Sequence, residues 1–183
     1  MNTEPPWEVT PLISELQIHL RTAQIAEQIV RDCQVREMAV VVVLKGAFVF
    51  AADLLRRLAE QGMSLEVDFL RAASYGENDR SAGKVSLQLD VSIDLVGKQV
   101  LLIDDICDTG LTLTNLVAHL KRKGTTNIKT CVLLDKPDRR QAVFNPDYSG
   151  FIIPDRFVVG YGLDYAEQFR CLPYIASIEP RKS

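Results

Sequence analysis

The hydrophobic residues of the chain gather in short continuous runs that are rich in β-branched side chains. Such runs are typical of strands that are buried on both faces, as in parallel sheets. Core strands are predicted at 39–44, 65–70, 98–103 and 128–134. Shorter strands are predicted at 151–159 and 174–178, and the alternating segment 85–91 predicts a half-exposed strand.

Segments with helical periodicity lie between these runs. Ser14 and Gln17 have the spacing of a capping box, and the apolar stripe that follows predicts a helix to about Cys33. Further helices are predicted at 47–60 and 112–123. Strands that alternate with helices predict an α/β fold, with a mainly parallel, twisted sheet flanked by helices on both faces. In such a sheet, ligands bind beyond the carboxyl ends of the strands.

Composition narrows the class of protein. A length of 183 residues suits one domain with a single core. The net charge of −3, from 21 basic and 24 acidic residues, argues against a nucleic-acid-binding protein, which needs a basic face. The longest apolar run, 38–44, is too short to cross a membrane, and the N-terminus lacks the pattern of a signal peptide. Four cysteines that lie far apart fit a reducing compartment, so a cytoplasmic location is predicted.

The strongest chemical signal follows the third core strand. Two adjacent carboxylates, Asp104 and Asp105, precede a turn and a helix start that contains Thr109, Gly110 and Thr112. Free N–H groups at a helix N-terminus bind phosphate, and glycine lets the backbone approach the anion closely. The carboxylates can accept hydrogen bonds from a vicinal diol. A site for both phosphate and diol predicts a ribose phosphate as ligand.

The run from Ile103 to Thr112 resembles the binding motif for 5-phosphoribosyl 1-pyrophosphate (PRPP) in type I phosphoribosyltransferases. Four further segments, in the expected order, narrow the resemblance to the hypoxanthine-guanine phosphoribosyltransferases: Leu44–Gly46, Ser74–Tyr75, Leu134–Pro137 and Pro154–Tyr165. The resemblance spans Ser14 to Ile178, nearly the whole chain. It implies the type I phosphoribosyltransferase fold as a single domain, with a core of about 35–150 and a small hood from about 1–14 and 151–183.

The resemblance also implies an activity: purine salvage with PRPP and a 6-oxopurine as substrates and Mg²⁺ as cofactor, by a homodimer or homotetramer. Asp108 is implied as the group that manages the purine N7 proton. PRPP is implied to contact Asp104, Asp105, Thr109, Gly110, Leu111 and Thr112, and its pyrophosphate Lys45, Gly46 and Arg170. The purine is implied to contact Lys136, Phe157, Val158 and Asp164, and Mg²⁺ Asp104, Asp105 and Asp164. Ser74 and Tyr75 would belong to a lid, and in the family the peptide bond before the lysine at position 45 is cis.

Several of these residues have a simpler local interpretation. Asp108 could N-cap the next helix, Lys45 and Lys136 could be surface lysines, and Phe157 could be a core residue. The polar segment 72–84, predicted as a long loop, could be a mobile surface loop instead of a lid.

The function also has rivals. One is an enzyme that prefers xanthine or guanine, and another is a regulator of the same fold that binds RNA or senses nucleotides. The negative charge and the presence of Asp108 disfavour the regulator. A flavodoxin-like phosphate-binding module without catalysis leaves Asp104, Asp105, Asp108 and Lys136 unexplained as a set.

Overall fold

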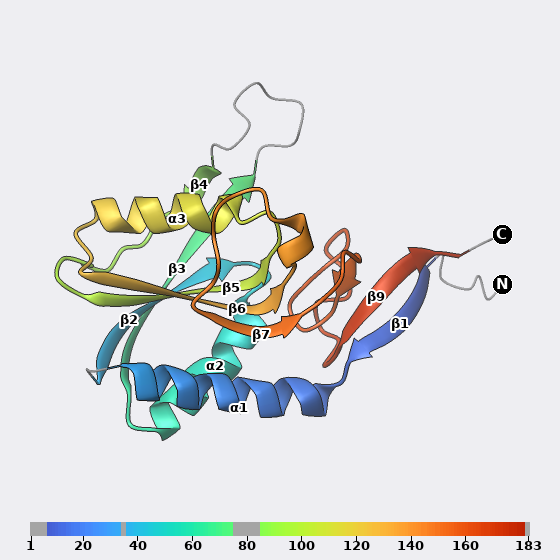
Figure 1. The fold of residues 1–183 in the computed structure, drawn as a ribbon, viewed down its shortest axis with the longest axis horizontal. Coiled ribbons are helices and arrows are strands. Elements are labelled where there is room, and N and C mark those ends of the chain that lie inside the picture. The colour runs from blue at the N-terminus through green and yellow to red at the C-terminus, as the bar shows by residue number, and fades with distance from the viewer. Residues whose placement is uncertain (1–6, 34–35, 75–84, 182–183) are drawn as a thin grey trace.

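A six-stranded sheet forms the centre of the computed structural model, which describes residues 7–33, 36–74 and 85–181 (Figure 1). The strand order is β4-β3-β2-β5-β6-β7, and only β4 runs antiparallel to its neighbour. The strands are β2 (Glu37–Leu44), β3 (Ser64–Ser74), β4 (Val85–Leu89), β5 (Gln99–Cys107), β6 (Asn127–Asp135) and β7 (Tyr148–Ile152). The prediction of a mainly parallel sheet is confirmed.

Helices cover both faces of this sheet. Helices α1 (Glu15–Asp32) and α2 (Phe48–Glu60) lie on one face, and α3 (Leu111–Arg122) lies on the other (Figure 1). Alternate residues of β2 enter two separate cores: Val40 and Val42 pack with α1 and α2, whereas Val41 packs with α3. Burial on both faces explains why the central strands are continuous apolar runs. None of the helices in the described ranges is both long and apolar enough to cross a membrane.

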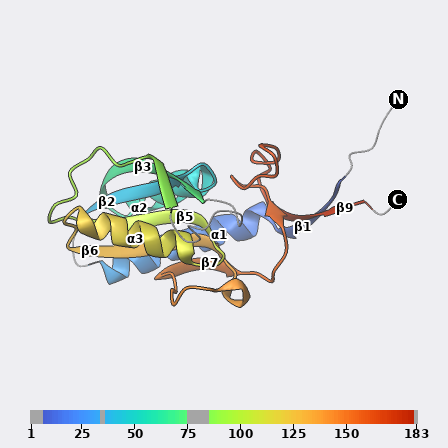
Figure 2. The ribbon, with the colours of Figure 1, turned by 90° about the horizontal axis from the view of Figure 1, so that it is seen from above.

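A second, three-stranded antiparallel sheet projects from one end of the core (Figure 2). It contains β1 (Trp7–Ile13), β9 (Ile175–Pro180) and the short β8 (Val158–Val159), in the order β1-β9-β8. Segments from the two ends of the chain therefore pair with each other, with Trp7 opposite Pro180. This small sheet has its own buried residues, Val159 and Ala176 among them.

Most of the predicted elements are confirmed, and the start of α1 is confirmed in detail. The backbone N–H of Ser14 donates to Gln17 Oε1 at 2.9 Å, and the N–H of Gln17 donates to Ser14 Oγ at 3.3 Å. This is the reciprocal capping box that the spacing predicts.

Three predictions about strand boundaries are wrong. Residues 72–74 were predicted as loop but belong to β3, because they pair with β4. The segment 151–159 is not one strand: it ends β7 in the large sheet and, after a break, forms β8 in the small one. β5 does not stop at Ile103 but continues to Cys107, because its ladder with β6 extends to Asp135. The strand β1 was not predicted.

The entry to β7 is fixed by one carboxylate. Asp147 Oδ2 accepts hydrogen bonds from the N–H of Thr130 at 2.8 Å and from its hydroxyl at 2.9 Å, and Oδ1 pairs with Lys129 Nζ at 2.8 Å. Burial alone would raise the pKa of Asp147, but the donors from Lys129 and Thr130 outweigh it and hold that pKa below its ordinary value.

We predict that Asp147→Ala lowers the free energy of unfolding at pH 7 by about 1–3 kcal/mol, because it leaves the buried donors of Thr130 unpaired. A carboxylate with a lowered pKa stabilises the fold above the ordinary pKa, and this stabilisation is lost as pH falls through the folded-state pKa. The difference from wild type should therefore persist down to pH 5 and shrink below pH 4. Urea unfolding at several pH values measures it, with the exposed Glu27 replaced by Ala as control. A difference that stays constant to pH 3 would contradict a charge-based role.

Candidate active site

Three turns that follow parallel strands meet at the carboxyl edge of the large sheet. They come after β2 at Lys45, after β5 at Asp108 and after β6 at Lys136. A cavity of about 260 Å³ lies at this edge. Its lining includes the acid/base candidate Asp108 and most of the residues implied for PRPP: Gly46, Asp104, Asp105, Thr109, Gly110 and Thr112. These turns lie beyond the carboxyl ends of the strands, where ligands are expected in such a sheet.

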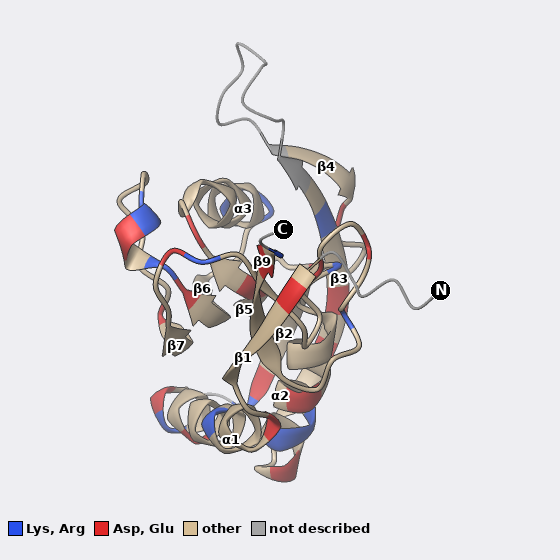
Figure 3. Ribbon diagram, turned by 90° about the vertical axis from the view of Figure 1, so that its right-hand side faces the viewer, with Lys and Arg blue, Asp and Glu red and all other residues tan. Residues whose placement is uncertain are grey.

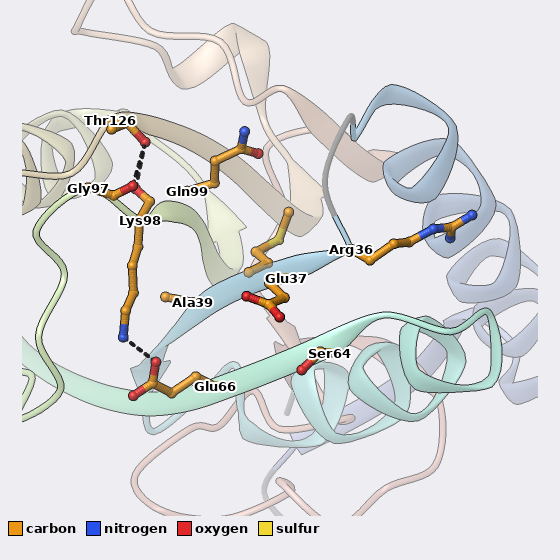
Figure 4. Close-up of a pocket in the computed structure, with 10 residues that line it drawn as sticks. Arg36, Glu37, Ala39, Ser64, Glu66, Gly97, Lys98, Gln99 and Thr126 are labelled. Carbon is orange, nitrogen blue, oxygen red and sulfur yellow. Dashed lines mark hydrogen bonds and ion pairs between the residues drawn. The ribbon is translucent and has the colours of Figure 1, made fainter.

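A larger hollow of about 660 Å³ lies at the opposite edge, where strands β2, β3 and β5 begin (Figure 4). Three of its charged side chains already have partners, because Lys98 pairs with Glu66 and Arg36 donates to the carbonyl of Gln61. It contains none of the predicted site residues. The cavity at the carboxyl edge is therefore the candidate site, although its volume is smaller than that of this hollow.

The two adjacent carboxylates form the floor of the site within β5. Asp104 is buried, and its Oδ1 accepts a hydrogen bond from the N–H of Asp105 at 2.9 Å. Burial raises the pKa of Asp104 well above its ordinary value, and the charge of Asp105 raises it further. Burial also raises the pKa of Asp105, although the positive charge of Arg170 opposes the change. The two carboxylates thus have little positive charge to compensate them, and they offer several oxygens as hydrogen-bond acceptors.

Two glycines allow three separate segments to touch beside these carboxylates. A Cβ atom on Gly46 would lie 1.5 Å from Asp105 Oδ2, so no larger residue fits there without displacing the carboxylate. A Cβ on Gly162, which has a φ of +101°, would lie 2.0 Å from the carbonyl oxygen of Gly46. The hydroxyl of Tyr161, the residue before Gly162, donates to the Asp53 carboxylate and so connects this segment to α2. The Leu44–Lys45 peptide bond is cis.

A network of charged residues forms the rim next to Gly46. Arg170 pairs with Asp164 at 2.8 Å and with Glu167 at 3.2 Å, and it donates to the carbonyl of Gly162 at 2.8 Å. Lys45 Nζ pairs with Glu167 Oε1 at 3.0 Å. The structure thus brings the implied residues Lys45, Asp164 and Arg170 together through Glu167. Sequence reasoning missed Glu167, although its spacing of three residues from both Asp164 and Arg170 was a signal.

Residues 109–112, which the resemblance implies as the phosphate loop, lead into α3 without a side-chain cap. Gly110 occupies the N-cap position with a φ of +80°, in the left-handed region that favours glycine. The alternative that Asp108 caps this helix is therefore wrong. Leu111 is the first helical residue, and its N–H is 3.4 Å from Thr109 Oγ1. Thr109 and Thr112 line the cavity beside these backbone groups.

Lys136 is buried, so the alternative of a surface lysine is wrong. Its Nζ donates to the carbonyl of Arg156 at 2.7 Å and lies 3.7 Å from Asp155 Oδ1. Asp108 Oδ1 pairs with Arg139 Nε at 3.2 Å, and the same guanidinium reaches Asp155 at 3.3 Å. Arg139 and Asp155, which the sequence did not single out, thus link the acid/base candidate to the lysine.

The remaining implied residues lie in the small sheet and at the end of β3. Phe157 is 54% exposed and meets Tyr165 edge to face at 5.5 Å, so it is not a core residue. Val158 is buried in β8 directly beside it. Ser74 is the last residue of β3, and Tyr75 lies outside the described residues.

The carboxylates suit a cation that needs few protein ligands. Within the described residues, no group of three His, Cys, Asp or Glu side chains is arranged to hold a metal ion. Mg²⁺ commonly uses one or two carboxylates together with substrate phosphates and waters. The adjacent acids of β5, and Asp164 on the rim, fit that requirement as two separate positions. Around the site, acidic and basic residues are interspersed (Figure 3).

Comparisons with known proteins agree with this geometry. The family model described as a phosphoribosyl transferase domain matches residues 13–166. The hypoxanthine-guanine phosphoribosyltransferase of Aquifex aeolicus (strain VF5) is 43% identical over 169 residues, which cover 92% of this chain and 93% of that protein. The enzyme of that name from Bacillus subtilis (strain 168) is 41% identical, with 92% of each chain covered.

Solved structures are also similar. A hypoxanthine-guanine phosphoribosyltransferase from Bacillus anthracis, with a HEPES molecule in its active site, has a TM-score of 0.87 and 43% identity. The match covers 94% of this chain and 99% of that one. A hypoxanthine phosphoribosyl transferase from Trypanosoma cruzi has a TM-score of 0.90 and 35% identity, over 97% of this chain and 94% of its own.

The Gly46 contact yields a prediction for stability. Gly46→Ala should lower the free energy of unfolding by about 1–3 kcal/mol, because the added methyl overlaps the Asp105 carboxylate. In an Asp105→Ala background the cost should largely vanish, since the nearest remaining atom of residue 105 is its Cβ at 3.4 Å. Urea unfolding of the four proteins measures this cycle.

Gly62→Ala is the matched control, because a Cβ there meets nothing within 4 Å but the φ of +82° is strained. Its cost of about 1 kcal/mol should be the same in both backgrounds. A Gly46→Ala cost that also stays the same in both backgrounds would show that the overlap with Asp105 is not its cause.

Proposed function

The chain belongs to the hypoxanthine-guanine phosphoribosyltransferase family, and we propose how its residues share the work of that family's reaction. The enzyme transfers the 5-phosphoribosyl group of PRPP to N9 of hypoxanthine or guanine, which gives IMP or GMP and pyrophosphate and salvages the purine. One observation carries the assignment: the buried Asp104, the partly buried Asp105 and the N-terminus of α3 share a single cavity. That combination suits a ribose that carries a phosphate.

The PRPP subsite consists of the acids and the phosphate loop. Backbone N–H groups of residues 109–112 bind the 5′-phosphate at the positive end of α3, with Leu111 as the first helical residue. Asp104 and Asp105 accept hydrogen bonds from the ribose 2′- and 3′-hydroxyls. The raised pKa values of these acids in the free protein show that their charged forms lack stabilising partners. Hydrogen bonds donated by the ribose hydroxyls would supply such partners.

The purine lies between Asp108 and Lys136. The N9–C1′ bond forms while the bond from C1′ to the pyrophosphate oxygen breaks, with inversion at C1′. As N9 attacks, the N7 proton passes to the Asp108 carboxylate, which acts as general base. Lys136 donates to the exocyclic O6, which selects 6-oxopurines over adenine, because adenine carries a donor there. The exposed ring of Phe157 stacks on the base, and the backbone of Val158 contacts its edge.

The leaving pyrophosphate is held at the rim by Lys45, Gly46 and Arg170. Mg²⁺ would be held by Asp104 and Asp105 and, at a second position, by Asp164, which also borders the purine. When bound, it neutralises charge on the pyrophosphate. Ser74 and Tyr75 belong to a lid that excludes water from the reacting ribose. We also propose a homodimer or homotetramer and a cytoplasmic location, the latter supported by four free cysteines.

The test is an assay of the protein with PRPP and Mg²⁺ against hypoxanthine, guanine, xanthine and adenine in turn. Hypoxanthine or guanine should be converted, and adenine should not, because Lys136 opposes its exocyclic amine. Turnover of adenine would overturn the role of Lys136. No turnover of any base, together with retained PRPP binding, would favour the rival regulator, whose RNA affinity should fall steeply with salt.

A second prediction separates chemistry from binding. Asp108→Asn should lower turnover by about 10²–10⁴-fold and leave the PRPP affinity nearly unchanged, because the amide keeps the shape but not the base. Steady-state kinetics and PRPP titration measure the two effects. Asp138→Asn, which neutralises an exposed carboxylate on the short helix Pro137–Arg139, is the charge-matched control. Equal losses in turnover and affinity would assign Asp108 to binding.

A further inference from the structure

Arg140 places a buried guanidinium directly under the start of the phosphate loop. Its side chain is 13% exposed and forms an ion pair with Asp135, whose side chain is 12% exposed. The other arm of the guanidinium donates from Nη1 to the backbone carbonyl of Asp108 at 2.6 Å and to Cys107 Sγ at 2.7 Å. Arg140 therefore binds the peptide of Asp108, the proposed base, and not its carboxylate.

Backbone hydrogen bonds fasten the two loops together on either side of this contact. The N–H of Lys136 donates to the carbonyl of Cys107 at 2.9 Å. The N–H groups of Gln141 and Ala142 donate to the carbonyl of Thr109 at 2.9 and 3.1 Å. Between these fixed points, the carbonyl of Asp108 has Arg140 as its partner. The loop after β6 and the loop after β5 thus form one unit, with Arg140 at its centre.

The stem of Arg140 packs against the phosphate loop as well. A Cβ on Gly110 would lie 2.9 Å from Arg140 Cδ, so the absence of a side chain at position 110 makes room for the arginine. The left-handed φ of +80° at Gly110 and the buried arginine are therefore parts of the same arrangement. A shift of Arg140 would reach both Asp108 and the N-terminus of α3.

The shape of the guanidinium explains why an arginine occupies this position. It is planar and carries its donors in a rigid fork, so fixing one arm sets the direction of the other. Asp135 is the last residue of β6 and holds one arm at the rigid sheet. The second arm then fixes the Asp108 carbonyl relative to Lys136, the neighbour of Asp135. A lysine, with a single ammonium on a flexible stem, cannot span both acceptors in this way.

We propose that Arg140 is a positioning residue for the phosphoribosyl transfer: it sets the Asp108 peptide so that the carboxylate faces the purine N7. The inference rests on the proposed role of Asp108 as the base. Misplacement of a reacting group by about 1 Å can cost on the order of 10²-fold in rate. The same fork ties the purine-contacting lysine to the base, so it sets the spacing between the two ends of the purine subsite.

The experiment is a double-mutant cycle on the single-turnover rate of IMP formation from PRPP and hypoxanthine. Arg140→Met should lower this rate on the order of 10²-fold in wild type. In the Asp108→Asn background, where no base remains to be positioned, the further loss should be within about twofold. Arg140→Lys should recover only part of the rate. The matched control is Arg21→Met, because Arg21 also donates to two backbone carbonyls, of Ser149 and Gly150, outside the site. It should leave the rate unchanged.

The outcomes separate this inference from the proposed function. An Arg140→Met loss that is equally large in the Asp108→Asn background would overturn the positioning role and leave a structural one. So would full activity of Arg140→Met. If wild type converts no purine, or Asp108→Asn keeps the full rate, the proposed function or the base fails instead, and with it the premise of the inference.

Arg140→Met leaves the buried Asp135 without its partner and could prevent folding. The variant Asp135→Asn with Arg140→Met removes both charges and keeps the test available. It should fold, as judged by circular dichroism, and show the same loss of rate in the same cycle. A normal rate in this folded variant would overturn the proposal.

Discussion

The close approach of the turn after β2 to the carboxylate of Asp105 is the constraint on which the candidate site depends. There is no room for a single methyl group between Gly46 and Asp105, nor between Gly162 and the carbonyl of Gly46. Three segments that are far apart in the chain meet because two of them lack side chains at the contact. The Tyr161 hydroxyl, bonded to Asp53 on α2, holds the third segment against the core. The segment that follows β8 therefore packs on the backbone of Gly46, which in turn packs on Asp105.

This constraint also determines the electrostatics of the site. Because the turn covers Asp105 and the sheet covers Asp104, both acids lose water, and their pKa values rise. The charge of Arg170 opposes the raised pKa of Asp105, but Arg170 is held by Asp164 and Glu167. The rim cations are thus already paired with rim carboxylates, which leaves the acids of β5 without full charge compensation. A hydrated cation at the acids improves this balance, whereas the hydroxyl groups of a diol donate hydrogen bonds to the carboxylate oxygens without adding charge.

The sequence predicts well whatever depends on one strand or one helix, and poorly whatever depends on pairing over long distances. The runs that became β2 and β6 are buried on both faces, so their pattern is unambiguous. β1 has mixed exposure and exists by pairing with β9 at the other end of the chain, which no local pattern reveals. Polar Asp104 and Asp105 suggested that β5 had ended, but its ladder with β6 continues past them.

The same limit applies to the site. The direction of the parallel strands places the implied residues that follow β2, β5 and β6 at one edge of the sheet, so the sequence motif located the cavity. The motif did not predict the contacts between loops. Glu167 lies between Lys45 and Arg170, Arg139 lies between Asp108 and Asp155, and Arg140 bonds to the backbone at the start of the phosphate loop. Each depends on where a flexible side chain of one loop meets another loop.

These ion pairs differ in burial. The exposed pairs can exchange partners with a ligand, whereas the buried pair keeps its partners. Lys45 and Glu167 are 44% and 64% exposed, so water screens their attraction and a phosphate can replace Glu167 at small cost. Arg140 and Asp135 are almost fully enclosed, and an anion that displaced Asp135 would leave a bare carboxylate in the interior. In the proposed reaction, the rim pairs are therefore suited to give way to pyrophosphate and to re-form after its release. The buried pair keeps its partners throughout, as the proposed role of Arg140 in positioning Asp108 requires.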